Sequence, residues 1–353
     1  MSHGQRPLVL LDAGAIANPR ILPDSWLSDC EIVAYPPGAL LYAPAAALSR
    51  AHAVVLRSMT RFGPGEAAAL PSLQALATLS SGVDHVTVEP VPLRHGRGGN
   101  AVAVADWVVW ALSRLWRDLD SFAGRRVAVV GVGAVGSAVS EALARLKVEL
   151  VLVDPPRARH DATFAGVSLD EAIEAGVDAI TLHVPRIRDG VDVTMGLLDL
   201  RRLNALSQRG GAVVLNAARG GVLDEVAAVA LRRSGRLAGL ALDVFVAEPS
   251  PDPAIVDGAD LVTPHIAGHS IEGKLRVGAL AIAALRRDLG LSDASVDFAS
   301  AVTAVAGSAR AASAPLQAFE VLDATDKALR VACAGDGDFT ALRGRHLRSE
   351  RGS

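Results

Sequence analysis

Residues 127–146 read VAVVGVGAVGSAVSEALARL: an apolar run, a glycine-rich turn and a stretch with helical spacing. The turn places Gly131, Gly133 and Gly136 in GxGxxG spacing. Glycine permits a tight turn and a close approach of the backbone, so that a pyrophosphate can bind at the N-terminus of the following helix. This order therefore predicts a strand, a dinucleotide-binding loop and a helix.

The next apolar run ends in Asp154, 18 residues after Gly136. An acid at the end of the second strand can accept hydrogen bonds from the adenosine ribose hydroxyls, and its charge repels a 2'-phosphate. These properties predict NAD as the cofactor. Arg157 and Arg159 follow directly, and nearby arginines can hold such a phosphate, so NADP stays open as the alternative.

The rest of the chain predicts an α/β protein with a doubly wound sheet. Buried parallel strands appear as near-continuous apolar runs separated by helical or loop stretches. Six such runs cover 127–130, 149–153, 178–183, 212–216, 237–243 and 260–263. Four earlier ones, LVLLD, EIVAY, AVVLRS and ALATLSSG, predict a separate first α/β unit before a long helix that starts near Asp106.

We expect two Rossmann-like or flavodoxin-like lobes with a cleft between them. Residues 1–105 and 272–290 are predicted to form the substrate-binding (catalytic) domain, because the helical stretch after Gly273 is long enough to return to the first unit. Residues 106–271 are predicted to form the NAD-binding domain. Residues 291–353 are too few for a large core, which predicts a small C-terminal segment that serves oligomerisation or covers the site.

Composition excludes several other classes of function. The formal net charge of the 353 residues is -3, so no global field attracts nucleic acid or an acidic membrane. Cys30 and Cys333 lie in no CxxC or Cys/His cluster, which argues against a disulfide framework and a metal site. The N-terminus has no long apolar signal region and no stretch could span a bilayer. A reducing cytoplasm is the expected location.

Three polar residues follow the later apolar runs: Arg219 in NAARGG, Glu248 in LDVFVAEP and His265 in TPHIAGHS. Open α/β sheets bind ligands at the carboxyl edge, where all three would lie. Oxidation of a secondary alcohol needs a base near neutrality, which favours His265. We assign Glu248 to orienting its ring and Arg219 to a two-pronged contact with a substrate carboxylate. Taken singly, each residue also has a structural interpretation: Arg219 as a surface cation, Glu248 as an acid in a turn, and His265 as a hydrogen-bonded histidine at a strand end.

From about Leu8 to Leu289 the chain resembles the D-isomer-specific 2-hydroxyacid dehydrogenases, which share this Arg, Glu, His order. The resemblance implies hydride transfer at C2 of a 2-hydroxy acid. It also implies that backbone amides of the loop SSGVDH, with Ser80, Ser81 and Gly82, hold the substrate carboxylate, and that Asp243 meets the nicotinamide carboxamide. The other cofactor contacts expected on this basis are at Ala134, Val135, Val184, Ala217, Ala218 and Gly268.

The segments LRSMT, GGNAVAVADW, VDPPRAR, TPHIAGHSIEGK and DFTALRGRHLR resemble a branch of this family whose substrate carries a phosphate. In that branch the C-terminal segment serves dimerisation and helps to cover the active site, so a homodimer is expected. A phosphorylated substrate needs further cations, and the candidates are Arg57 with Ser58, and Arg343.

The chain departs from this branch at three positions. His269 and His346 stand where an aromatic hydroxyl is usual, and Val184 replaces a threonine. A polar imidazole at position 269 can still meet an anion. Two alternatives remain: another 2-hydroxyacid dehydrogenase, acting on 3-phosphoglycerate or on glyoxylate and hydroxypyruvate, and a binding protein that senses NAD(H) without turnover.

Overall fold

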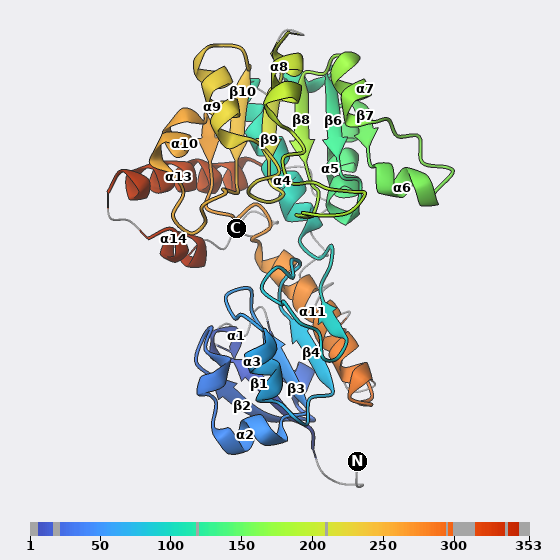
Figure 1. The fold of residues 1–353 in the computed structure, drawn as a ribbon, viewed down its shortest axis with the longest axis vertical. Helices are drawn as coiled ribbons and strands as arrows, with labels where there is room; N and C mark the ends of the chain where they lie inside the picture. The colour runs from blue at the N-terminus through green and yellow to red at the C-terminus, as the bar shows by residue number, and fades with distance from the viewer. Residues whose placement is uncertain are drawn as a thin grey trace. The chain divides into compact units, whose positions relative to one another are not determined.

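The predicted apolar runs form parallel strands, as expected for strands that helices cover on both faces. The structure, a computed structural model, describes residues 6–16, 22–117, 120–208, 211–293, 296–298, 315–335 and 338–345. The chain divides into two units (Figure 1): unit 1 is Met1–Asn100 with Ser270–Ala311, and unit 2 is Ala101–His269 with Ala312–Ser353. Each has its own parallel sheet, which confirms the predicted α/β class with two Rossmann-like lobes.

Unit 1 has a five-stranded sheet in the order β2-β1-β3-β4-β5. Its strands are β1 (Leu8–Asp12), β2 (Glu31–Tyr35), β3 (Ala53–Leu56), β4 (Ala75–Thr78) and β5 (Leu93–His95). The sequence analysis does not predict β5, because a run of three residues with two polar members gives no strand pattern. Strand β1 is fully buried and pairs with both β2 and β3, so the sheet reverses its winding direction beside β1.

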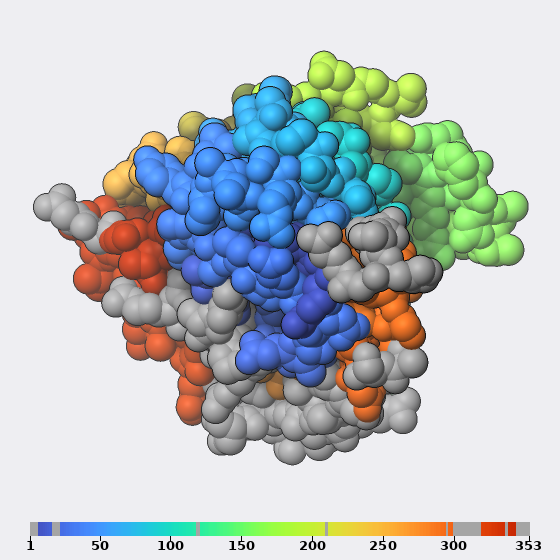
Figure 2. All heavy atoms as spheres, turned by 90° about the horizontal axis from the view of Figure 1, so that it is seen from below, coloured from blue at the N-terminus to red at the C-terminus, as the bar shows by residue number. Residues whose placement is uncertain are grey.

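The helices of unit 1 include one that comes from late in the sequence. They are α1 (Ala13–Ile16), α2 (Ala45–Arg50), α3 (Pro64–Ala68), α11 (Ile271–Asp288) and the 3-10 turns η1 (Asp24–Leu27) and η2 (Leu40–Tyr42). Helix α11 packs against β4 and β5, and its orange atoms border the blue atoms of the first strands and helices in Figure 2. Unit 1 is therefore discontinuous in sequence.

Unit 2 has a six-stranded sheet in the order β11-β10-β9-β8-β6-β7. Its strands are β6 (Arg126–Val130), β7 (Glu149–Val153), β8 (Ala179–Leu182), β9 (Val213–Asn216), β10 (Gly239–Leu242) and β11 (Leu261–Val262). All lie within the six predicted runs or extend them by one residue. Strand β6 pairs with β7 on one side and β8 on the other, which places the switch point of the sheet between β6 and β8.

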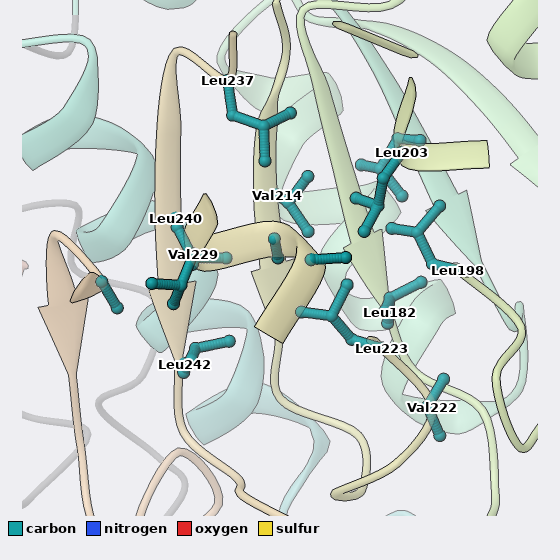
Figure 3. Packing of buried hydrophobic residues seen from close by; sticks show 14 of the residues in the cluster. Leu182, Leu198, Leu203, Val214, Val222, Leu223, Val229, Leu237, Leu240 and Leu242 are labelled. Carbon is teal, nitrogen blue, oxygen red and sulfur yellow. The ribbon is translucent and has the colours of Figure 1, made fainter. Parts of the chain in front are cut away.

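Helices cover both faces of this sheet. They are α4 (Ala101–Leu115), η3 (Asp120–Phe122), α5 (Ala134–Arg145), α6 (Pro155–His160), α7 (Leu169–Glu174), α8 (Leu200–Gln208), α9 (Glu225–Arg233), α10 (Pro253–Gly258), α13 (Pro315–Ala334) and α14 (Phe339–Arg345). One core lies beneath α7 to α10, where Leu182, Val214 and Leu240 of the sheet meet Leu203 of α8 and Val229 of α9 (Figure 3). A second core joins the opposite face to α4 and α5.

The C-terminal helix α13 packs on unit 2. It contributes Leu329 to one core and Phe319 and Leu322 to the other. Asp326 accepts a hydrogen bond from the backbone N–H of Val262 at 2.8 Å, so α13 covers the edge strand β11. Arg330 donates to the carbonyls of Val256, Ala259 and Asp260.

The long helix predicted from Asp106 begins at Ala101. Its first turn, AVAVA, alternates small apolar residues and carries no charge, so its helical period is hidden in the sequence. Among the described residues, no helix combines the length and the hydropathy needed to cross a membrane.

Candidate active site

The glycine-rich loop lies at the switch point of the unit 2 sheet. Gly131 follows β6 with φ of 88°, a conformation that L side chains rarely adopt. A Cβ on Gly131 would meet the carbonyl of His183, the residue after β8, at 2.7 Å. The two strand ends are therefore in backbone contact, and only glycine permits that contact. Val184 also borders this turn.

The other two glycines have different surroundings. A Cβ on Gly136 would lie 2.0 Å from the carbonyl oxygen of Gly131, so glycine is needed there for helix α5 to pack on the turn. A Cβ on Gly133, the N-cap of α5, would meet nothing within 4 Å. Open space thus lies beside the N-terminus of a twelve-residue helix, with Ala134 and Val135 in its first turn. This cradle fits a dinucleotide pyrophosphate.

Asp154 ends β7 beside the same loop. Its carboxylate accepts hydrogen bonds from the backbone N–H of Val132 at 2.7 Å and of Arg157 at 2.9 Å. The Arg157 guanidinium lies over the Phe164 ring and bonds Asp161 at 3.2 Å. Arg159 pairs with Asp192. Both arginines are thus engaged by carboxylates, and the negative charge of Asp154 remains beside the loop, which fits NAD better than NADP.

Asp243 organises the turn that carries the histidine. Its buried carboxylate accepts hydrogen bonds from the Thr263 hydroxyl at 2.6 Å and from the backbone N–H of Ile266 and Ala267 at 2.7 and 3.0 Å. Its backbone carbonyl accepts from the N–H of His265 at 2.7 Å. Burial raises the pKa of Asp243, and these hydrogen bonds act in the opposite direction. Asp243 therefore fixes the backbone on both sides of His265.

His265 and Glu248 form a hydrogen-bonded pair. Nδ1 of His265 lies 2.8 Å from Oε2 of Glu248. His265 has φ of 56°, in the left-handed region that non-glycine residues adopt only when their surroundings impose it. Burial opposes the charge of Glu248, but the hydrogen bond and charge of His265, the N–H of Phe245 and the charge of Arg343 together lower its pKa. Glu248 is therefore an ionised partner that orients the ring.

Arg219 lies on the neighbouring loop, after β9. Its guanidinium donates to the carbonyl of Ala218 at 2.7 Å, and the Asn216 amide donates to the carbonyl of Arg219 at 3.1 Å. Asn216 also accepts from the N–H of Ala218 at 3.1 Å. A Cβ on Gly220 would lie 2.0 Å from the carbonyl oxygen of Phe245. The loop that carries Arg219 thus packs directly on the loop that carries Glu248.

In unit 1, Arg57 lies at the switch point of the sheet. Its guanidinium is 3.8 Å from Asp12, the last residue of β1, and Ser58 beside it is exposed. The buried Asp12 carboxylate also accepts from Thr60 at 2.6 Å and from the N–H of Gly14 at 2.8 Å. Asp12 therefore ties the loop after β3 to the end of β1.

The loop with Ser80, Ser81 and Gly82 follows β4, the neighbour of β3. The Ser80 hydroxyl donates to the carbonyl of Gly82 at 2.7 Å and bonds Thr78, whose hydroxyl also bonds Nε2 of His85 at 2.9 Å. Burial lowers the pKa of His85, which keeps its ring neutral at neutral pH. The loop is thus held by its own side chains.

The remaining predicted residues lie in unit 2. Gly268 and His269 follow the turn of His265, and Ala217 follows β9. Arg343 of α14 acts on Glu248 through its charge, and Phe339 of α14 meets the Phe245 ring edge-on. Position 346 lies outside the described residues. Among the residues described, no group of His, Cys, Asp and Glu side chains is suited to a metal ion.

Sequence reasoning missed the residues that hold the loops, such as Thr263, Asn216 and Glu225. They touch backbone or other side chains rather than a ligand, so no motif marks them. For Glu225 the sequence gives no signal, because an acid in the first turn of a helix fits an exposed position near the positive end of the helix dipole. It is 6% exposed.

Residues 94–267 match the model of the family described as "D-isomer specific 2-hydroxyacid dehydrogenase, NAD binding domain". Among curated proteins, the chain is 40% identical to the erythronate-4-phosphate dehydrogenase of Salinibacter ruber, over 65% of this chain and 60% of the relative. It is 38% identical to the enzyme of that name from Chromohalobacter salexigens, over 70% and 65%. The matches thus span less than two thirds of these relatives.

The solved structures show the fold. A D-lactate dehydrogenase from Aquifex aeolicus, complexed with NAD and lactic acid, superimposes with a TM-score of 0.62 and 19% identity, covering 80% of this chain and 95% of that one. That structure has the same α/β architecture as the chain described above.

Proposed function

We propose that this chain, whose residues 94–267 match the model of the NAD-binding domain of D-isomer specific 2-hydroxyacid dehydrogenases, oxidises 4-phospho-D-erythronate to 2-oxo-3-hydroxy-4-phosphobutanoate. The observation that supports this most is the pairing of His265 with Glu248 at 2.8 Å in the unit that also holds the dinucleotide loop. The relatives named erythronate-4-phosphate dehydrogenase support the substrate. The resemblance assigns this step to the route to pyridoxal phosphate.

His265 is the base that takes the proton from the C2 hydroxyl. Its Nδ1 is engaged by Glu248, so Nε2 is the atom that receives the proton. The carboxylate of Glu248 then stabilises the imidazolium. NAD supplies the acceptor for the hydride that leaves C2, and Gly131, Gly133, Gly136 and Asp154 would hold it.

Arg219 binds the substrate carboxylate, because a guanidinium offers two parallel donors that match it. Backbone amides of the Ser80, Ser81 and Gly82 loop bind the same group. The phosphate is assigned to Arg57 with Ser58 and to Arg343, and His269 is a further polar contact. The C-terminal segment is proposed to form a homodimer, as the resemblance implies.

The test is NADH formation from a panel of acids: 4-phosphoerythronate, 3-phosphoglycerate, glycerate, lactate and unphosphorylated erythronate, each with NAD and with NADP. We expect the highest kcat/KM with 4-phosphoerythronate and NAD. Higher kcat/KM with an unphosphorylated acid or with 3-phosphoglycerate would contradict the proposed substrate. NADH binding without turnover on any acid would indicate a sensor rather than an enzyme.

Two variants test the phosphate contacts within the same panel. Arg57→Ala and Arg343→Ala should each raise KM for 4-phosphoerythronate by about tenfold or more, because each removes a charged donor. With a poor unphosphorylated substrate, the same variants should change KM little. An equal effect on both substrates would contradict phosphate binding by that arginine.

A further inference from the structure

Two loops carry the proposed catalytic residues of unit 2. The Arg219 loop, residues 217–223, joins β9 to α9, and the Glu248 loop, residues 243–249, follows β10. Their backbones touch where Gly220 meets Phe245. A shift of one loop against the other would move Arg219 relative to the His265–Glu248 pair, so this contact needs to be held.

Glu225 joins the two loops. It is the first residue of α9, next to the N-cap Asp224, and its side chain points inward rather than to solvent. Its carboxylate accepts a hydrogen bond from the backbone N–H of Val246, on the Glu248 loop, at 2.8 Å. In the chain Glu225 comes two residues after the end of the Arg219 loop, so its backbone continues that loop directly. One buried carboxylate, attached to the Arg219 loop through the chain itself, thus accepts a backbone hydrogen bond from the Glu248 loop.

We propose that Glu225 is a positioning residue for the reaction, which fastens the Arg219 loop to the Glu248 loop and so sets the guanidinium against the acid–base pair. This inference rests on the proposed function. A hydrogen bond from a backbone N–H to a buried carboxylate is stronger than one in an exposed loop, so it fixes the position of one loop relative to the other.

The surroundings of Glu225 make its charge sensitive to pH. Burial raises the pKa of Glu225 to about 7, the N–H of Val246 opposes this, and the carboxylates of Glu248 and Asp224 raise it further. Asp252 lines the same hollow of about 300 Å³, from the N-cap of α10. The groups that face Glu225 are therefore carboxylates, and its own charge adds to that of Glu248 as the pH rises through neutrality.

The variants are Glu225→Ala, which removes the hydrogen bond to Val246, and Glu225→Gln, which keeps the shape but removes the charge. The matched control is Asp252→Asn, which removes a charge from the same hollow while an amide oxygen can still cap α10. Hydrogen–deuterium exchange of the two loops, residues 217–223 and 243–249, without substrate, should speed up about tenfold in Glu225→Ala and not in Asp252→Asn. Unchanged exchange in both loops would overturn the proposal.

Kinetics on the full chain give the second readout. We expect kcat to fall about tenfold or more in Glu225→Ala, with the Kd of NADH much less affected. In Glu225→Gln the acidic limb of the kcat/KM–pH profile should move to lower pH by about half a unit, because a negative charge near the acid–base pair is gone. A profile lowered uniformly without that movement would indicate a merely structural role.

The two proposals can fail separately. If the wild type prefers another 2-hydroxy acid, the proposed substrate is wrong, and the Glu225 variants are measured with that acid. If the wild type oxidises 4-phosphoerythronate but both loops exchange normally in Glu225→Ala, the inference about Glu225 is wrong and the proposed function stands.

Discussion

At the scale of single residues, carboxylates position the site mainly through hydrogen bonds that fix the backbone of its loops, and not through their charge alone. Asp243 holds the turn around His265 through three hydrogen bonds. That support compensates for the left-handed φ of His265, which would otherwise cost about 1–3 kcal/mol. Glu248 then orients the ring through Nδ1. The histidine is thus placed before any substrate binds.

His265→Ala should abolish turnover, with a loss of about a thousandfold or more in kcat, because it removes the base. Glu248→Gln should cost less, about tenfold to a hundredfold, because the ring remains but its orientation and its ionised partner are lost. Titration of both variants with NADH should give a Kd close to that of the wild type. A fully active His265→Ala protein would refute the proton-transfer role.

The same pair predicts how stability depends on pH. The pKa of Glu248 is lowered below 4.5 in the folded protein. The ionised carboxylate therefore stabilises the fold above the unfolded-state pKa, and this contribution is lost as the pH falls through the folded-state value. The difference in Tm between the wild type and Glu248→Gln should accordingly shrink below pH about 4.5.

The sequence was sufficient to place Arg219, Glu248 and His265 at strand ends, because each follows an apolar run and parallel strands share one carboxyl edge. It could not reveal the φ of His265 or the partners of Asp243 and Glu225. Those depend on where a carboxylate from one loop meets backbone from another, and no spacing rule describes such contacts.

At the scale of elements, two glycines of the glycine-rich turn have different roles: one permits close packing, and the other leaves space for a ligand. Gly136 has no room for a side chain because α5 lies against the turn, whereas Gly133 faces open space. Both glycines belong to one sequence motif, so the sequence alone cannot distinguish their roles. The strand–loop–helix order itself was predictable, since burial on both faces gives β6 and β8 continuous apolar runs. Strand β5 and the first turn of α4 carry no such signal.

Gly136→Ala should lower Tm by several degrees, because its methyl group would overlap the carbonyl of Gly131. Gly133→Ala should leave Tm nearly unchanged but weaken NADH binding about tenfold, because its methyl group would enter the open cradle. Differential scanning fluorimetry and NADH titration separate the two effects. A Gly133→Ala protein with normal NADH affinity would contradict the assignment of this cradle to the pyrophosphate.

At the scale of the whole molecule, the chain consists of two α/β units with the same strand order at their switch points. Unit 2 contains the glycine-rich loop, the His265–Glu248 pair and Arg219, and unit 1 places Arg57 at its own switch point. Helix α13 packs on the two cores of unit 2 through Phe319, Leu322 and Leu329, and α14 packs through Phe339. The sequence could not assign that surface, because these contacts join residues 64 to 213 positions apart in the chain.

The central claim is that hydride leaves C2 of 4-phosphoerythronate for NAD. The most direct measurement uses substrate deuterated at C2 and mass analysis of the reduced cofactor. We predict NADH that carries one deuterium, and none in the His265→Ala protein. NADH without deuterium, or no NADH from this substrate, would contradict the claim.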